Sequence, residues 1–119
     1  MAESCLFCGA EKFEVVAENE LSYAIRDKFP VTELHTLIIS KQHYDHAFDL
    51  PEDELTAIFD LAKKCRESIL KEDSTVQGFN FGTNSGKVAG QKINHVHFHL
   101  IPRRLGDIEP PPAVEGKYT

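Results

Sequence analysis

The sequence predicts an α+β fold in which a five-stranded antiparallel sheet carries one long helix, preceded by a short N-terminal helix or turn. Five segments rich in β-branched and aromatic residues are separated by turn residues, whereas one segment, residues 51–71, has apolar residues at helical spacing. Strands and helices therefore do not alternate as a parallel sheet requires. With 119 residues, 41% of them hydrophobic and 27% charged, the chain matches one globular domain.

The first three strands are expected between residues 13 and 40. Residues 13–27 mix apolar and polar positions on both sides of the polar residues 18–20, which is typical of a hairpin. Residues 28–30 end in a proline and are expected to form a loop. The next segment, residues 34–40, is apolar and β-branched enough for a buried strand, and His35 stands at its start.

The long helix is expected over residues 51–71. Pro51 suits a helix start, and the three acids after it lie in the first turn, where the helix dipole stabilises negative charge. The residues expected to face the sheet are Leu55, Ile58, Phe59, Ala62, Cys65, Ile69 and Leu70. Cys65 is interpreted as a core residue in preference to a reactive thiol.

The last two strands are expected at residues 78–83 and about 93–101. Phe79 and Phe81 alternate in the first of them, and the connection through residues 84–91 contains the glycines and serine of a loop.

The domain is expected to cover residues 1–105, followed by an extended tail over residues 106–119. Three consecutive prolines at 110–112 and Gly116 cannot continue a sheet or a helix, so the tail is available to a partner.

Charge, hydrophobic runs and cysteine content argue against nucleic-acid binding, membrane insertion and secretion. The net charge is −6 and the basic residues are scattered, which disfavours general nucleic-acid binding, although a few placed cations can still bind a phosphate ligand. No apolar run approaches the roughly 18 residues that span a bilayer, and the acidic N-terminal region does not resemble a signal peptide. Three cysteines make an odd number, and two of them lie in a CxxC turn, which indicates thiol or metal usage in a reducing compartment and not a disulfide framework. We expect a soluble, cytoplasmic protein.

The main chemical feature is the alternation of histidines in residues 95–100. In a strand His95, His97 and His99 would share one face, opposite an apolar face. The histidines could be solvent-exposed without a role, could chelate zinc, or could act at phosphorus. We favour the third interpretation, because an imidazole nitrogen attacks without first losing a proton and forms a labile phosphoramidate. His97 would be the nucleophile, with its neighbours holding its tautomer and stabilising negative charge.

The segment HVHFHLI resembles the HφHφHφφ signature (φ, apolar) of the histidine triad family. The resemblance continues along the chain through CLFCG, AIRD, LHTLIISKQH, NSGKVAGQ and IPRR. The chain is similar to the Hint and fragile-histidine-triad branches of this family and to bacterial-type members that open with CxxC. The resemblance implies an antiparallel sheet with one long helix, a homodimer in which two sheets become one, and nucleotide hydrolysis.

The resemblance also assigns catalytic roles. His97 would attack the α-phosphate of a nucleotide and release the leaving group before water opens the nucleotidyl-histidine. His99 and His35 would contact the phosphate, and the ring of His95 would support the orientation of the nucleophile. Transferase branches carry glutamine at the third triad position, so His99 favours hydrolysis over transfer.

Substrate-binding residues follow in the same way. Asp27 matches the acid that binds the ribose hydroxyls, and Asn84 and Gln91 match loop residues that bind the phosphate or leaving group. The base would lie against a wall of three apolar residues, each of which could equally be ordinary core: Leu6, Phe7 and Ile25. Lys92 departs from the serine or threonine of many members; it could bind an additional phosphate or face solvent.

The pair Cys5 and Cys8 admits three interpretations: zinc ligands, a redox pair, or incidental thiols. A redox CxxC belongs in a βαβ unit, which the N-terminus lacks. The resemblance implies a structural zinc held by both cysteines with His43 and His95, and His46 is a weaker substitute for His43. Such a metal would fix the N-terminal turn and the ring of His95, whereas the chemistry itself would need no cofactor.

The leading hypothesis is an enzyme that releases a nucleoside monophosphate from a nucleoside phosphoramidate, an acyl-nucleotide or a dinucleoside polyphosphate. The alternative is a nucleotide-binding regulatory module in which hydrolysis is incidental. A purely structural zinc protein would leave Asp27, Asn84 and Gln91 without a role.

Overall fold

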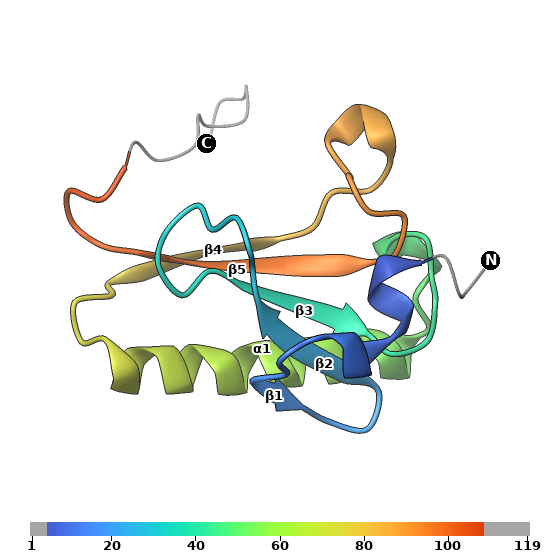
Figure 1. Ribbon diagram of the computed structural model, residues 1–119, viewed down its shortest axis with the longest axis horizontal. Helices are drawn as coiled ribbons and strands as arrows, with labels where there is room; N and C mark the ends of the chain where they lie inside the picture. Colours follow the sequence, from blue (N-terminus) through green and yellow to red (C-terminus); the bar gives the residue numbers. More distant parts are fainter. Residues whose placement is uncertain (1–4, 109–119) are drawn as a thin grey trace.

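The computed structural model describes residues 5–108, which form one antiparallel sheet with a long helix packed on one face (Figure 1). The helix, α1, spans Glu52–Glu72. The sheet has the spatial order β1-β2-β3-β5-β4, and its strands are β1 (Ala17–Glu18), β2 (Ser22–Arg26), β3 (Thr36–Ser40), β4 (Gly78–Gly82) and β5 (His97–Arg103). The predicted fold class is confirmed.

Four short 3₁₀ turns complete the described chain. Two of them, Leu6–Cys8 and Ala10–Lys12, form the expected short N-terminal helix or turn. The others are Ala47–Asp49, just before α1, and Lys87–Ala89, between β4 and β5. No helix in this part of the chain is long and apolar enough to cross a membrane.

The register of the sheet places the two histidines of β5 beside apolar residues of β3. His99 pairs with Leu37 and His97 with Ile39. On its other side His99 pairs with Gly82 of β4, which has no side chain to occupy the space beside the ring. Because side chains alternate along a strand, both imidazoles point to the face opposite α1.

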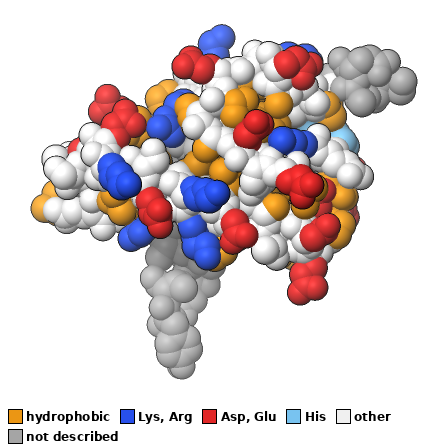
Figure 2. All heavy atoms as spheres, turned by 90° about the horizontal axis from the view of Figure 1, so that it is seen from below, with side chains coloured by type: hydrophobic (Ala, Val, Ile, Leu, Met, Phe, Trp, Pro, Cys, Tyr) orange, Lys and Arg blue, Asp and Glu red, His pale blue; other side chains and the backbone are white. Residues whose placement is uncertain are grey.

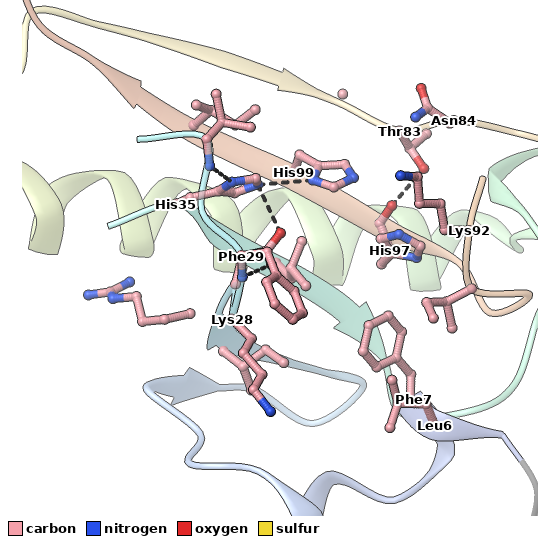
Figure 3. Close-up of a pocket in the computed structure, with 18 of the residues that line it drawn as sticks. Leu6, Phe7, Lys28, Phe29, His35, Thr83, Asn84, Lys92, His97 and His99 are labelled. Atoms are coloured by element: carbon pink, nitrogen blue, oxygen red, sulfur yellow. Dashed lines mark hydrogen bonds and ion pairs between the residues drawn. The ribbon is translucent and has the colours of Figure 1, made fainter. Parts of the chain in front are cut away.

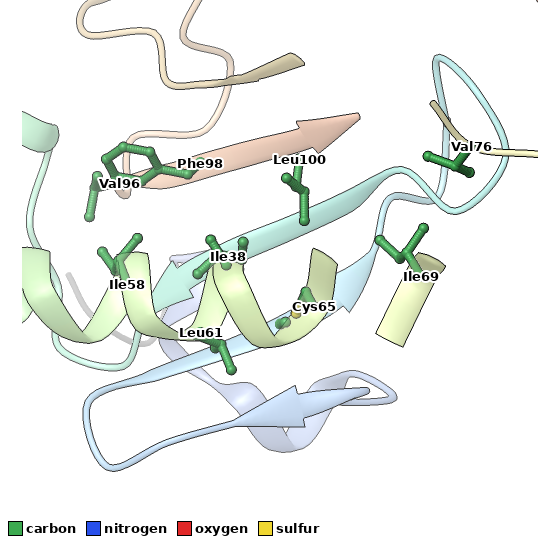
Figure 4. Packing of buried hydrophobic residues seen from close by; sticks show 11 residues of the cluster. Ile38, Ile58, Leu61, Cys65, Ile69, Val76, Val96, Phe98 and Leu100 are labelled. Carbon is green, nitrogen blue, oxygen red and sulfur yellow. The ribbon is translucent and has the colours of Figure 1, made fainter. Parts of the chain in front are cut away.

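The main core lies between the sheet and α1 (Figure 4). Val96, Phe98 and Leu100 face the helix, as the alternation predicts, and all three are buried. Acidic and basic side chains are interspersed over the side of the molecule where α1 lies (Figure 2).

The predicted face of α1 was partly wrong. The helix buries Ile58, Ala62, Cys65 and Ile69 as expected, but it also buries Glu54 and Leu61, while Leu55 and Phe59 stay about half exposed. The buried stripe therefore runs about one position away from the predicted one, because the sheet decides which side of an apolar helix is covered. Phe59 instead lies beside Phe81 of the edge strand β4, with 6.0 Å between ring centroids.

A second, smaller core covers the other face of the sheet. It contains Phe7 of the N-terminal turn together with Tyr23 and Ile25 of β2 and Leu37 and Ile39 of β3. The Tyr23 hydroxyl donates a hydrogen bond to the Phe7 carbonyl at 2.5 Å. The N-terminal turns thus cover part of this face.

The last strand differs from the prediction at both ends. Its pairing begins at His97, so His95 lies in a bend before the strand, where the Val96 N–H donates to the Tyr44 carbonyl. The strand continues through Pro102 to Arg103. Arg103 forms an ion pair of 3.0 Å with Asp107. The predicted tail spans residues 106–119, and its part after residue 108 lies outside the described residues.

Candidate active site

A cavity of about 1230 Å³ lies on the face of the sheet opposite α1, where β2, β3 and β5 present their side chains. Every residue predicted to be catalytic or substrate-binding lines it except His95 and Gln91. Figure 3 shows His35, His97 and His99 along one side of it. The sheet and the N-terminal turn therefore bring together residues that are more than 90 positions apart in the sequence.

His97 has one ring nitrogen held by the backbone. Its Nδ1 lies 2.8 Å from the carbonyl oxygen of His95, which can only accept a hydrogen bond, so in the neutral ring the proton is on Nδ1 and the lone pair is on Nε2. The ring is 8% exposed and its edge meets Phe7, with 5.2 Å between ring centroids. This contact comes from the carbonyl of His95, whereas the prediction assigned the support to its ring.

His35 and His99 form a hydrogen-bonded pair whose proton positions are also determined. The Val31 N–H donates to Nδ1 of His35 at 3.0 Å, so the proton of His35 is on Nε2. That nitrogen lies 3.0 Å from Nδ1 of His99, which must then accept. His99 consequently carries its own proton on Nε2 and can donate it to an oxygen in the cavity.

Both of these rings are neutral near pH 7. Burial, followed by the neighbouring His97 and His35, lowers the pKa of His99 to about 4 against the smaller opposing effect of Asp27. Burial also lowers the pKa of His35, against the opposing effect of Asp27. The pair therefore acts as a fixed hydrogen-bond donor rather than as a cation.

Asp27 lies at the end of β2, at the border of the cavity. One carboxylate oxygen accepts the Phe29 N–H at 2.9 Å, and the other lies 3.5 Å from Nε2 of His35. Its side chain is 18% exposed and lines the cavity. A carboxylate in this position can accept hydrogen bonds from two vicinal hydroxyls.

The apolar part of the cavity lining contains the three residues predicted to form its wall and several apolar residues that were not predicted. Phe7 and Ile25 are both wall and core, since each is buried in the smaller core, whereas Leu6 is 47% exposed. The sequence analysis did not assign Phe29, which is 81% exposed at the cavity, although its position two residues after Asp27 was a usable signal. Further apolar lining residues that were not assigned are Phe13, Val31, Leu37, Phe81, Ile93 and Ile101.

A second cluster lies beside the cavity and contains Cys5, Cys8, His43 and His95. One ligand atom from each falls within 4.8 Å of the others. Nδ1 of His95 is 3.2 Å from the Cys5 sulfur, and Nδ1 of His43 is 3.2 Å from the Cys8 sulfur. His46 is not in the group and lies 3.5 Å from Asp49 instead, which decides between the two predicted histidines.

The surroundings of this cluster fit a metal centre. Nε2 of His95 lies 2.8 Å from the Ser40 carbonyl, and Nε2 of His43 lies 3.1 Å from Asp45. Both rings therefore direct Nδ1 toward the sulfur atoms and have an acceptor behind them, as metal-bound histidines do. Two sulfur and two nitrogen donors can hold a metal ion and are compatible with zinc.

Comparison with known proteins identifies the family. The model of the HIT domain matches residues 10–106, which include the three histidines of the cavity. The chain belongs to the HIT domain family.

Two relatives of this HIT protein extend the match over most of its length. An uncharacterized HIT-like protein of Methanocaldococcus jannaschii is 41% identical over 109 residues, covering 88% of this chain and 83% of that protein. An adenosine 5′-monophosphoramidase of Candida albicans is 37% identical over 108 residues, covering 85% of this chain and 71% of that protein.

A solved structure shares the fold of this HIT domain. The crystal structure of a zinc-bound histidine triad family protein from Mycobacterium smegmatis superimposes with a TM-score of 0.81 at 30% identity. The match covers 90% of this chain and 80% of that one.

The loop between β4 and β5 of the HIT domain contributes Asn84 but not Gln91. The side-chain amide of Gln91 hydrogen-bonds to backbone groups of the protein. Its Oε1 accepts the Gly86 N–H at 2.7 Å, and its Nε2 donates to the Asp45 carbonyl at 2.6 Å. Gln91 therefore does not line this cavity, and its predicted contact with the phosphate or leaving group stays a prediction. Gln91 instead ties the loop to the segment after β3.

Gly90 shapes the same loop. Its φ of +100° is in the left-handed region, and an added Cβ would lie 3.3 Å from the Asn84 amide nitrogen. A glycine is needed here for both reasons. The loop can then hold Asn84 against the cavity.

The cavity is electropositive although the chain is acidic. Its lining includes Lys12, Arg26, Lys28 and Lys92, and among residues 5–108 Asp27 is the one acidic residue that lines it. Arg26 lies 3.6 Å from Glu72, but none of the three lysines has an ion-pair partner in the part of the chain that the structure describes. This local charge favours an anionic ligand.

Proposed function

We propose that this HIT domain hydrolyses nucleotides at the α-phosphate and releases a nucleoside monophosphate. The observation that carries the proposal is the geometry of His97: its Nδ1–H donates to the His95 carbonyl, so Nε2 is the ring nitrogen available for attack in an electropositive cavity. The phosphoramidase activity named for the Candida albicans relative supports the same reaction class.

The first step transfers the nucleotidyl group to the protein. The Nε2 lone pair of His97 forms a bond to phosphorus, and the bond from phosphorus to the leaving group breaks with its electron pair on the leaving group. The ring then carries a positive charge while its Nδ1 proton remains. The hydrogen bond to the His95 carbonyl becomes charge-assisted, which stabilises the intermediate.

The second step returns the enzyme to its starting state. Water attacks phosphorus, the phosphorus–nitrogen bond breaks, and its electron pair returns to Nε2 of His97. The proton lost by water leaves with the monophosphate or with solvent. His99 donates its Nε2–H to a phosphoryl oxygen in both steps, and the Val31–His35–His99 chain of hydrogen bonds keeps that donor in place.

The remaining lining residues orient the nucleotide. The base would pack on Leu6, Phe7 and Ile25, and the ribose hydroxyls would donate to Asp27. Asn84 would bind the phosphate or leaving group. Candidate substrates are a nucleoside phosphoramidate, an acyl-nucleotide and a dinucleoside polyphosphate.

The test is replacement of the nucleophile. His97→Ala should lower kcat/KM for adenosine 5′-phosphoramidate by more than about a thousandfold, because no other group forms the covalent intermediate. AMP should still bind with an affinity within about tenfold of the wild type, measured by calorimetry. Lys64→Gln, on the exposed side of α1, is the control and should keep full turnover.

Two outcomes would contradict the proposal. Full turnover in the His97→Ala variant would show that another group is the nucleophile. Binding of AMP by a wild type that turns over neither phosphoramidate nor dinucleoside polyphosphate would favour a nucleotide-binding regulatory module.

We also propose that the cluster of Cys5, Cys8, His43 and His95 holds a structural zinc. Such an ion would join the N-terminal turn, the segment after β3 and the entry to β5, and it would supply stability rather than chemistry. Metal analysis of protein purified without chelator should give about one zinc per chain. Less than about 0.2 per chain would refute the assignment.

A homodimer is the third proposal, and β4 is its expected edge. Of the two edge strands, β1 has two residues and β4 has five, and β4 presents Phe81, which is 40% exposed beside Phe59 at 52%. An exposed edge with aromatic residues is prone to pairing. Phe81→Glu should give a monomer in light scattering, whereas Phe48→Glu, at an 87% exposed residue outside the sheet, should leave the dimer intact.

A further inference from the structure

A second cavity adjoins the first on the side of the β4–β5 loop. Its volume is about 660 Å³, and Gly90 and Lys92 line both cavities. The other residues that line it are Asp45, His46, Gly86, Lys87, Gln91 and Asn94. A molecule bound to His97 in the first cavity can therefore extend past Lys92 into the second.

In the second cavity the acidic side chain has polar partners, whereas the two lysines have no ion-pair partner among the described residues. The Asp45 carboxylate lies 3.1 Å from His43 and 3.4 Å from the Asn94 amide. Lys87 and Lys92 are exposed, and neither forms an ion pair with any residue in the described range 5–108. The cavity thus offers two uncompensated ammonium groups to a ligand.

The position of Lys92 is fixed by its neighbours in the chain. The Gln91 amide preceding it is held by Gly86 and Asp45, and Ile93 after it lines the first cavity. Figure 3 shows Lys92 at the His97 end of the cavity, away from Lys28 and Phe29. Its ammonium is therefore on the side of the nucleophile, where a leaving group departs.

We propose that the second cavity is the subsite for the leaving group, and that Lys92 and Lys87 make it select a leaving group that carries phosphate. The inference rests on the proposed function and names its preferred substrates: nucleotides whose α-phosphate is linked to a further phosphate, such as dinucleoside polyphosphates. The two lysines offset the charge of the phosphates beyond the α-phosphate.

The chemistry gives Lys92 a reason to act on the transition state. When the bond between the α-phosphorus and the bridging oxygen breaks, the electron pair stays on that oxygen, and the departing phosphate gains negative charge. An adjacent ammonium stabilises this charge without transferring a proton. An amine leaving group must instead take up a proton. It then presents no anion that the Lys92 ammonium could stabilise.

The experiment compares two substrates in one set of variants. For wild type, Lys92→Gln, Lys87→Gln and Lys92→Arg, kcat/KM is measured with diadenosine triphosphate and with adenosine 5′-phosphoramidate. Lys92→Gln should lower the ratio of the two values by about tenfold or more, since it removes one charge-assisted contact. Lys87→Gln should lower it less, and Lys92→Arg should stay within about threefold of the wild type.

Controls separate this inference from the proposed function. Lys64→Gln removes the same charge outside both cavities and should leave the ratio unchanged, and added salt should lower the ratio for the wild type more than for Lys92→Gln. An unchanged ratio in Lys92→Gln, or an equal loss with both substrates, overturns the leaving-group subsite. Only retained turnover in His97→Ala would overturn the nucleophile itself.

Discussion

Replacing His99 by glutamine should make the stability of the protein less sensitive to acid. The pKa of His99 is lowered to about 4 by burial, whereas an exposed or unfolded histidine has a value of about 6.5. The folded state thus prefers the neutral ring. Its contribution is fully present above about pH 6.5 and is lost as the pH falls from there toward 4. Glutamine keeps an acceptor for His35 but does not titrate.

The magnitude follows from linkage between folding and proton binding. Moving from pH 7 to pH 5 with values of about 6.5 unfolded and about 4 folded costs about 2 kcal/mol. Because the ring keeps part of its surface in contact with water, we take about 1 to 2 kcal/mol. Urea unfolding of wild type and His99→Gln at pH 7, 6 and 5, with equal added zinc, measures the difference. Equal losses in the two proteins would refute the conclusion that folding keeps His99 neutral.

Three other predictions concern the fold and the loop. Leu61→Ala should cost about 2 to 4 kcal/mol in urea unfolding because the side chain is fully buried, whereas Leu55→Ala should cost less than about 1. Gly90→Ala should lower kcat/KM by more than about tenfold, because it strains the left-handed backbone and presses on Asn84; unchanged kinetics would show that the loop adapts. Tyr23→Phe should lower the urea midpoint by an amount equivalent to about 1 to 2 kcal/mol, since it leaves a buried carbonyl of the N-terminal turn without its donor.

The sequence predicted those parts of the fold and site that depend on local periodicity. Alternation along a strand put His97 and His99 on one face and Phe98 on the other, and the structure agrees. Helical spacing located α1 to within one residue at each end. It could not determine which apolar stripe the sheet covers, so Leu55 was expected inside and Leu61 was not.

Features that depend on how loops close were beyond the sequence. The hydrogen bonds of Gln91 and the bend at His95 arise from contacts with segments about 50 residues away, which no local pattern encodes. The two cavities that Lys92 lines also depend on contacts between segments that are distant in the sequence. The resemblance had already favoured His43 over His46 as a metal ligand, and the structure places His43 and not His46 beside the cysteines.

The two-sided character of β5 has a consequence for how this chain can change over evolutionary time. Its residues 97 and 99 face the cavity, and its residues 98 and 100 fill the core. Loss or gain of a single residue inside β5 would reverse this assignment for every residue beyond the change, moving side chains from the cavity face to the face that packs on α1. Substitutions can therefore accumulate one at a time along the strand, whereas changes in length are tolerated only in the surrounding loops.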